Sequence, residues 1–500
     1  MRVADSARMA EIDRLAQERY AIPQAALMED AGLRAYLLAR ERVWDGGPPP
    51  GPVVFLAGRG NNGGDALVMA RQCRLDGGRD LAVVLGAGEP AEGSLAATHL
   101  AICRALGLPV LPFPEQAAEI ERLLAGARWL VDGLLGTGLS GAARAPLADL
   151  IRLANASPAR SVAVDLPSGL GDAFRPGYPA VEAECTLTIG LPKPCLFLPL
   201  ARALCGRILV VPGVFPGDLL ESPQLPGRML LPEELEELPA LPRDAHKGRR
   251  GHLAVFAGSE GTTGAAWLAA TAAARSRAGL VSLFLPRALY PAALPRFKSV
   301  MVRPWEAASE PERLDLRRFS ALLIGPGWST AADRPRWLAH LLSLGLPGVL
   351  DADGLTLLAG LASRPRLSGR WVLTPHPGEF ARIAGIELAR VLEDPLPVLL
   401  RTAAELEAVI VLKGHCTFIA APDGRYWILD GMNPALATGG SGDVLAGAIA
   451  GLAAGGMPVL EAARFGVLLH SRAGEEAHRE AGYFLAEDLL PYLSAALKGR

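Results

Sequence analysis

Short apolar runs alternate with stretches of helical spacing along most of this 500-residue chain. Apolar positions over residues 5–42 recur with a helical period, and a Pro/Gly cluster at 46–52 ends that region. Strand-like runs follow, separated by helical stretches at 64–76, 93–106 and 145–154: PVVFLAG (52–58), DLAVVLG (80–86), WLVDGLLG (129–136), SVAVDLP (161–167), CTLTIG (185–190) and GRILVV (206–211). This alternation predicts βαβ units around a parallel sheet.

A Pro-rich segment at 211–248 interrupts the alternation, and its turn-like composition predicts a linker. Beyond it the strand-like runs return: HLAVFAG (252–258), LVSLFLP (280–286), ALLIGPG (321–327), GVLDADG (348–354), RWVLTP (370–375), AVIVLKG (408–414) and TFIAAPDGRYWILD (417–430). The last run predicts a hairpin that turns at Pro422, Asp423 and Gly424. We therefore expect two α/β domains, at 1–222 and 241–500, joined by a linker at 223–240.

Composition limits the possible partners. Half of the residues are hydrophobic and the formal net charge is −2, so no strong field favours nucleic acid or an anionic membrane. The N-terminal stretch carries charges throughout, and no run of about 18 apolar residues occurs, which argues against a signal peptide or a membrane span. The six cysteines form no CxxC pair, so we expect buried thiols in a reducing compartment and a cytoplasmic protein.

Lysine is rare among the basic residues. The chain has 50 lysines and arginines together, but the lysines are few: Lys193, Lys247, Lys298, Lys413 and Lys498. A chain so biased toward arginine keeps lysine where a compact ammonium is needed, because the planar guanidinium cannot imitate it. A lysine in the C-terminal tail needs no such role.

The segment ATGGSGDVLAG at 437–447 joins a glycine-rich turn to the start of a helix. Glycines let backbone N–H groups converge on an anion, and a helix N-terminus favours a phosphate. Asp443 in that first turn would repel a permanently bound phosphate, so it indicates a reaction in which a substrate hydroxyl is phosphorylated or expelled. The alternative is an ordinary N-capped helix after a flexible turn.

Three loops of the first domain follow predicted strands: GRGNNGGDALVMARQC (58–73), VDGLLGTGLSGAAR (131–144) and VDLPSGL (164–170). Each alone could be a plain turn that caps a helix. Together they lie at the edge where open α/β sheets bind ligands, which favours one shared site. Asparagine and carbonyl oxygens with one carboxylate could hold a weakly hydrated cation beside a phosphate there.

The motifs GRGNNGGDALVMAR, DGLLGTGLSG and VDLPSG resemble the YjeF N-terminal family, whose members epimerise the hydrated nicotinamide cofactors NADHX and NADPHX. The resemblance implies a Rossmann-like domain, with Asp165 as a catalytic residue and a potassium ion held by Asn62, Asp132 and Ser168. The family usually reads NNGGDG, whereas Ala66 follows Asp65 here. The residues implied to contact the hydrate are Asn61, Asn62, Gly63, Gly64, Asp65, Gly136, Thr137, Gly138, Leu139, Ser140, Gly141, Ala142 and Asp165.

The second domain carries HKG, GPG, DAD, TPHPGE, LKG and GGSGDVLAG in that order. This set resembles the ADP-dependent NAD(P)H-hydrate dehydratases of the YjeF C-terminal family, which are ribokinase-like. The resemblance implies ADP as phosphoryl donor with Mg²⁺, AMP as product, and a homo-oligomer. Trp328 follows GPG where the family commonly has leucine, close to the expected hydrate. The implied hydrate contacts are Ala265, Gly327, His376 and Asp443, and the implied nucleotide contacts are Lys413, Gly414, His415, Cys416, Thr417 and Gly442.

The two resemblances together imply a bifunctional repair enzyme for NADHX and NADPHX. Asp443 would accept the proton of the substrate hydroxyl as it attacks a phosphoryl group, and the N–H groups of 440–442 would stabilise the charge in transit. His376 would orient the nicotinamide or its sugar, unless it is a loop histidine bonded to backbone. Two alternatives remain: a ribokinase-like kinase of a vitamin precursor with an accessory domain, and a first domain that serves only as a binding scaffold.

Overall fold

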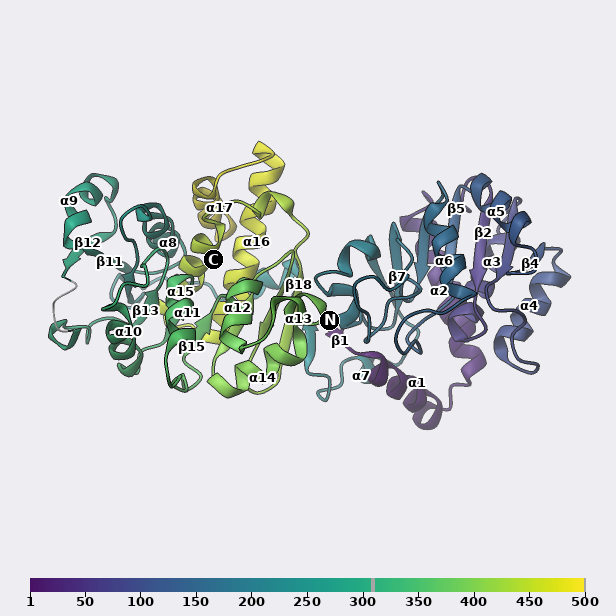
Figure 1. Cartoon of the computed structure of the whole chain (residues 1–500), viewed down its shortest axis with the longest axis horizontal. Helices are drawn as coiled ribbons and strands as arrows, with labels where there is room; N and C mark the ends of the chain where they lie inside the picture. The colour runs from purple at the N-terminus through teal and green to yellow at the C-terminus, as the bar shows by residue number, and fades with distance from the viewer. Residues whose placement is uncertain (307–310, 499–500) are drawn as a thin grey trace. The chain divides into compact units, whose positions relative to one another are not determined.

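The computed structural model describes residues 1–306 and 311–498, and the chain divides into two compact units, Met1–Gly227 and a second that begins at Arg228 (Figure 1). Both units are α/β, as predicted, and each has its own buried core. Within the described residues, no helix is long and apolar enough to cross a membrane.

The first unit is built on a parallel sheet with the strand order β4-β3-β2-β5-β6-β7-β8. Val53, Phe55 and Ala57 of β2 belong to one core and the alternate residues Val54 and Leu56 to another, so both faces of the sheet are covered. The strands are β2 (Val53–Ala57), β3 (Leu81–Leu85), β4 (Val110–Pro112), β5 (Trp129–Gly133), β6 (Arg160–Val164), β7 (Cys185–Ile189) and β8 (Arg207–Val211).

The helices of the first unit are α1 (Ser6–Tyr20), α2 (Gln24–Arg42), α3 (Asn61–Leu75), α4 (Leu95–Ala105), α5 (Ala117–Gly126), α6 (Leu147–Ala156) and α7 (Gly217–Leu220). The single helical region expected near the N-terminus is divided by left-handed Ala21 and by Pro23. Helix α3 begins at Asn61, three residues earlier than 64–76 suggested. The NNGGD motif is therefore the first turn of a helix, with its N–H groups at a helix N-terminus.

The second unit has a mixed sheet, in the order β9-β18-β17-β16-β15-β14-β13-β10-β11-β12. Pairing is parallel from β16 to β12, whereas β17 and β18 form the predicted antiparallel hairpin. The short strands β4, β9 and β12 were not predicted. The strands are β9 (Gly227–Met229), β10 (His252–Phe256), β11 (Leu280–Pro286), β12 (Met301–Trp305), β13 (Ala321–Ile324), β14 (Gly348–Leu350), β15 (Trp371–Leu373), β16 (Val409–Leu412), β17 (Cys416–Ala420) and β18 (Tyr426–Asp430).

The helices of the second unit are α8 (Thr263–Arg275), α9 (Tyr290–Ala293), α10 (Arg334–Ser343), α11 (Asp353–Gly360), α12 (Pro377–Ala384), α13 (Leu388–Glu393), α14 (Leu396–Leu406), α15 (Ser441–Ala454), α16 (Val459–Ala481) and α17 (Leu489–Ala496). Helices α8 and α15 can pack closely because glycines of α15 face α8 and have no Cβ. A Cβ on Gly447 would lie 2.3 Å from the carbonyl oxygen of Ala269, and one on Gly451 would lie 2.6 Å from that of Ala273. The helices are therefore parallel, and their first turns lie at the same end.

The Pro-rich segment between the sheets is ordered. Strand β9 and a 3-10 turn at Pro232–Glu237 fall within it, and the side chains of Leu230, Leu235 and Leu238 are buried in the core of the second unit. Proline-rich composition therefore marks irregular backbone in this segment, which still contributes apolar surface to the core.

Candidate active sites

The first candidate site lies at the carboxyl edge of β2, β5 and β6, which are neighbours in the sheet. Because the strands are parallel, the start of α3 and the loops at 134–142 and 165–170 follow them at the same edge. The three sequence motifs of the first unit are thereby brought together. The 136–142 loop is partly exposed, whereas Asp132 and Ser168 are fully buried.

Asp132 and Ser168 form the buried centre of this site. The Ser168 hydroxyl donates to Asp132 Oδ1 at 2.5 Å, and the Ser168 N–H donates to Asp132 Oδ2 at 2.7 Å. Burial raises the pKa of Asp132 to about 6, although the hydrogen bonds from Ser168 and Leu134 lower it. These bonds fix the 165–170 loop against β5.

Asn62 presents an unpaired oxygen at the same place. Its amide nitrogen donates to the carbonyl of Leu135 at 2.7 Å, and the residue is only 8% exposed. Its Oδ1 is buried and has no hydrogen-bond partner among the described residues. A buried amide oxygen without a donor is costly, so it indicates a ligand such as a cation. Asn62, Asp132 and Ser168, the residues implied for potassium, do come together.

Asp65 and Asp165 supply two further carboxyls. Burial raises the pKa of Asp65 well above its usual range, and the charges of Asp165 and Asp13 add to this effect. Asp165 lies in the left-handed region with φ of 64°, a strained conformation for a non-glycine residue. Two carboxyls in unlike environments are the arrangement that separates an acid from a base.

Ala66 follows Asp65 in helix α3. It is fully buried in the core, and a Cβ built on Gly133 would lie 2.4 Å from the Ala66 Cβ. The extra methyl group is therefore accommodated by a glycine on β5.

The second candidate site centres on the first turn of α15. Gly440 precedes the helix with φ of 94°, as the glycine-rich motif predicts. In the described part of the chain, the N–H groups of Gly440, Gly442 and Asp443 donate to no backbone carbonyl, so they are free to bind an anion. Burial raises the pKa of Asp443 to about 7; the charge of Asp351 raises it further, and that of Lys413 lowers it.

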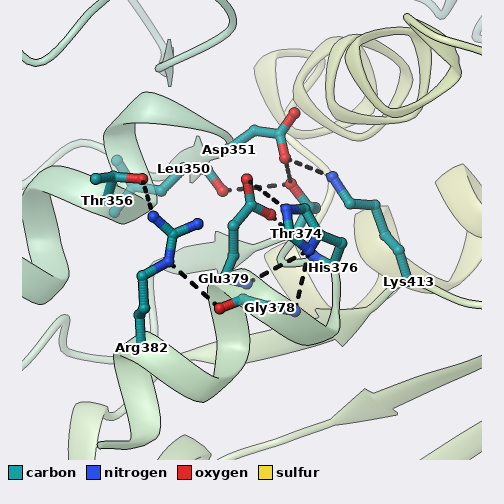
Figure 2. A network of polar contacts seen from close by, with 9 residues as sticks. All are labelled: Leu350, Asp351, Thr356, Thr374, His376, Gly378, Glu379, Arg382 and Lys413. Atoms are coloured by element: carbon teal, nitrogen blue, oxygen red, sulfur yellow. Dashed lines mark hydrogen bonds and ion pairs between the residues drawn. The ribbon is translucent and has the colours of Figure 1, made fainter. Parts of the chain in front are cut away.

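Lys413 lies next to this turn, since a Cβ on Gly442 would lie 3.1 Å from its Nζ, and Figure 2 shows it beside Asp351 and Thr374. Its ammonium donates to Asp351 Oδ1 at 2.8 Å, and the Thr374 hydroxyl donates to the same oxygen at 2.8 Å. Burial lowers the pKa of Lys413, but Asp351, Glu379 and Asp443 outweigh burial and raise it. Lys413 is therefore a fixed positive charge among carboxylates.

His376 caps helix α12, as Figure 2 shows. Its Nδ1 accepts from the N–H of Gly378 at 3.0 Å, while Glu379 accepts from the His376 N–H at 2.9 Å. The His376 side chain is nevertheless 54% exposed. The backbone-bonded loop histidine that the sequence offered as an alternative is therefore present, and its ring still remains accessible.

A cavity of about 700 Å³ runs between these elements. It is lined by His376, Lys413, Gly414, His415, Thr417 and Gly442 of the predicted set, together with His470 and Ser471 of α16. Cys416 is not among the lining residues; its side chain is 5% exposed, and its Sγ lies 3.6 Å from Asp430 Oδ1. The alternation of a strand explains this, since Cys416 and Thr417 face opposite ways.

Ala265 and Gly327 do not line that cavity. Ala265 is in the first turn of α8, at the same end of the helix pair as Asp443. The carbonyl of Gly327 accepts from the Thr262 hydroxyl at 2.7 Å. Trp328 is fully buried, and its ring packs beside Phe256 in the core.

Known protein families match both the first and the second part of this chain. A family model described as NAD(P)H-hydrate dehydratase matches residues 253–495, and one described as YjeF-related protein N-terminus matches residues 24–195. The chain is 37% identical to the bifunctional NAD(P)H-hydrate repair enzyme Nnr of Moorella thermoacetica, over 100% of this chain and 97% of that protein. It belongs to the bifunctional NAD(P)H-hydrate repair enzyme family. The same enzyme of Coxiella burnetii is 36% identical over 97% of this chain and 96% of its own.

Among solved structures, the ADP/ATP-dependent NAD(P)H-hydrate dehydratase of Bacillus subtilis is 31% identical, with a TM-score of 0.48, covering 54% of this chain and 97% of that chain. The repair-enzyme resemblance drawn from the motifs is confirmed for both halves of the chain. The predicted α/β fold class is confirmed by the parallel sheet of the first unit and the mixed sheet of the second.

Sequence reasoning gave four residues of these repair-enzyme sites no role. Asp351 and Glu379 lie within the DAD and TPHPGE motifs, and their contacts with Lys413 and His376 could be seen only in the fold. His470 of α16 lies in a region without a motif. Lys193 is paired with Asp165, and the rarity of lysine was the signal that could have found it.

Proposed function

We propose that this chain repairs hydrated nicotinamide nucleotides in two steps, with the first unit interconverting the R and S epimers of NADHX and NADPHX and the second dehydrating the S epimer. The observation that carries the proposal is Asp443, a carboxyl whose pKa is raised to about 7 in a helix turn with free N–H groups. Such a group can exchange a proton near neutral pH beside a phosphoryl group.

In the dehydratase unit, Asp443 takes the proton of the hydrate's ring hydroxyl while that oxygen attacks the terminal phosphoryl group of ADP. The N–H groups of Gly440 and Gly442 and the ammonium of Lys413 stabilise the negative charge on the transferred group. Phosphate then leaves with the C–O bond electrons, pushed by the lone pair of the ring nitrogen. Loss of a ring proton restores NADH or NADPH, so the products include AMP and phosphate.

The predicted nucleotide contacts surround the cavity described above, with Gly414, His415 and Thr417 on one side and Gly442 on the other. The carboxylates around Asp443, which include Asp351 and Asp353, suit a magnesium ion carried by the nucleotide phosphates. When bound, the magnesium ion neutralises charge on the phosphates. His376 presents its exposed ring to the nicotinamide or its ribose.

In the epimerase unit, Asp165 is the base and Asp65, whose raised pKa favours the protonated form, is the acid. The hydroxyl proton passes to Asp165 as the O–H electrons form a carbonyl. The C–N electrons move to the ring nitrogen, which takes the proton of Asp65. Closure on the other face of the carbonyl reverses each transfer and inverts the carbon. The residues implied for the hydrate at 61–65 and 136–142 border these two carboxyls.

Potassium fits the first unit because the buried Oδ1 of Asn62 has no hydrogen-bond partner among the described residues. Asn62 and Ser168 both bond to the backbone of Leu135, and Ser168 also bonds to Asp132. Neutral oxygens with one carboxylate suit a monovalent, weakly hydrated cation. When bound, the ion supplies positive charge beside the substrate's phosphates.

The test uses mixed R and S NADPHX with ADP or ATP and follows the return of the reduced-nicotinamide absorbance. Complete recovery shows both units working, and a stop at the S fraction shows an inactive epimerase. Formation of a stable phosphorylated product without NADPH would replace the dehydratase by the vitamin-precursor kinase. If NADPH is recovered with ADP and hardly at all with ATP, ADP is the phosphoryl donor.

We also propose a cytoplasmic homo-oligomer that binds no nucleic acid. All six cysteines are buried and none of them forms a disulfide, which suits a reducing compartment. Size measurement in solution tests the assembly.

A further inference from the structure

Lys193 is a buried cation without an assigned role. Its side chain is 1% exposed and forms an ion pair with Asp165, whose side chain is 14% exposed. Its ammonium also donates to the carbonyl of Ile189 at 2.8 Å and to the hydroxyl of Thr188 at 3.2 Å. Three acceptors use all three N–H donors of the ammonium, so the position of its charge is fixed.

The contacts of Asp165 divide unequally between its two oxygens. Oδ1 accepts from Lys193 and from the N–H of Ile189, the latter at 3.0 Å. Among the described residues, no hydrogen bond to Oδ2 is formed. One oxygen is therefore held by the protein, and the other is available to a ligand at the partly exposed end of the carboxylate.

The backbone of Asp165 adds a second constraint. The residue has φ of 64°, and its N–H donates to the carbonyl of Leu187 at 2.9 Å. A non-glycine residue with a strained, left-handed backbone persists only where neighbouring contacts hold it. Lys193, which follows β7 by four residues, supplies such a contact from the neighbouring strand.

We infer that Lys193 is a positioning residue of the epimerase site, which anchors Asp165 through Oδ1 so that Oδ2 exchanges the hydroxyl proton of the hydrate. This inference rests on the proposed epimerase function. Lysine is required because the site encloses a compact ammonium, and the larger guanidinium would not fit among the three acceptors.

The test measures conversion of R-NADPHX to the S epimer, as kcat and KM, in the full chain and in Lys193→Met. We expect kcat to fall about 100-fold at neutral pH with little change in KM. Arg71→Met is the matched control, because it removes a largely buried cation from an ion pair with Glu29 in the same unit.

Dehydration of pure S-NADPHX by each variant reports on the second unit, and thermal unfolding reports on the first. If Lys193→Met does not fold, Lys193→Gln, which keeps a donor without the charge, is measured in its place. A folded variant with the wild-type kcat would overturn the inference. Wild-type chain that does not convert R to S at all would instead remove the proposed epimerase function, so the two failures are distinguishable.

A double variant separates positioning from bulk stability. If Lys193 acts through Asp165, Lys193→Met should cause no further loss of epimerisation in an Asp165→Asn background. The double variant should also unfold at a higher temperature than Lys193→Met alone, because it leaves no unpaired buried charge. Additive losses would contradict the inference.

Discussion

Gly442 leaves room for the ammonium of Lys413: a Cβ at Gly442 would lie 3.1 Å from Lys413 Nζ. The start of α15 and the end of β16 are thus in contact through a glycine and a lysine 29 positions apart in the chain. The glycine leaves the positive charge beside the free N–H groups of the helix turn, where a phosphoryl group would bind.

Replacing Gly442 by alanine should therefore weaken the second unit selectively. The added methyl group would press on Lys413 and cover the helix N-terminus, so we expect dehydration of S-NADPHX to fall about tenfold or more, mainly through KM for ADP. Gly360→Ala is the matched control, because a Cβ there meets nothing within 4 Å. Equal ADP kinetics in the two variants would contradict a close approach of phosphate to Gly442.

Asp443→Asn should abolish dehydration and leave nucleotide binding largely intact. In the wild type, the base must be ionised, so dehydration should rise with pH through about 7, the pKa of Asp443. Turnover against pH and calorimetric titration with ADP check the two statements. Near-normal turnover in Asp443→Asn would remove the assignment of the base.

Stability should also depend on Asp443. Its folded pKa of about 7 lies above the ordinary value of 3.8, so wild-type stability should fall as pH rises between these values. Asp443→Asn should then unfold at a higher temperature than the wild type above pH 7, and the difference should vanish in acid. Thermal scans across this range measure it, and a variant less stable at high pH would show that burial of the charge carries no cost.

Lys413→Met should move the pH dependence of dehydration in a known direction. The charge of Lys413 lowers the pKa of Asp443, so its loss should shift the acidic limb to higher pH, even at saturating ADP. Lys498→Met, in the tail, is the control for loss of a lysine. An unchanged limb would indicate that another group titrates in the wild type.

The sequence predicted the strand runs and motif loops well, because buried parallel strands are continuous apolar segments bounded by glycine and proline. Lateral side-chain contacts could not be predicted. Asp351 and Lys413 are 62 positions apart, and only the strand order places them together. The burial of the Trp328 side chain could not be predicted either, since its orientation depends on a turn in which Gly327 and Ser329 both have positive φ.

Asn62 offers a direct test of the potassium proposal. Asn62→Ala removes the unpaired buried oxygen, and the epimerisation of R-NADPHX should lose its dependence on potassium along with most of its rate. The measurement titrates potassium against sodium at constant ionic strength. Asn155→Ala is the matched control, because it removes an amide that donates to the carbonyl of Ala180 and is not an implied cation ligand. A wild-type epimerase indifferent to potassium would show that another ligand satisfies Asn62.

Ala66 is the departure from the family motif that the structure explains, and Ala66→Gly restores the usual glycine. The methyl group packs on Gly133 of β5 inside the core, so Ala66→Gly should leave the epimerase rate nearly unchanged. It should instead destabilise the first unit by about 1 kcal/mol, because glycine lowers helix propensity and leaves a methyl-sized void. Epimerisation kinetics and chemical unfolding of the same variant separate the two effects. A marked gain in rate with unchanged stability would mean that the methyl group obstructs the substrate.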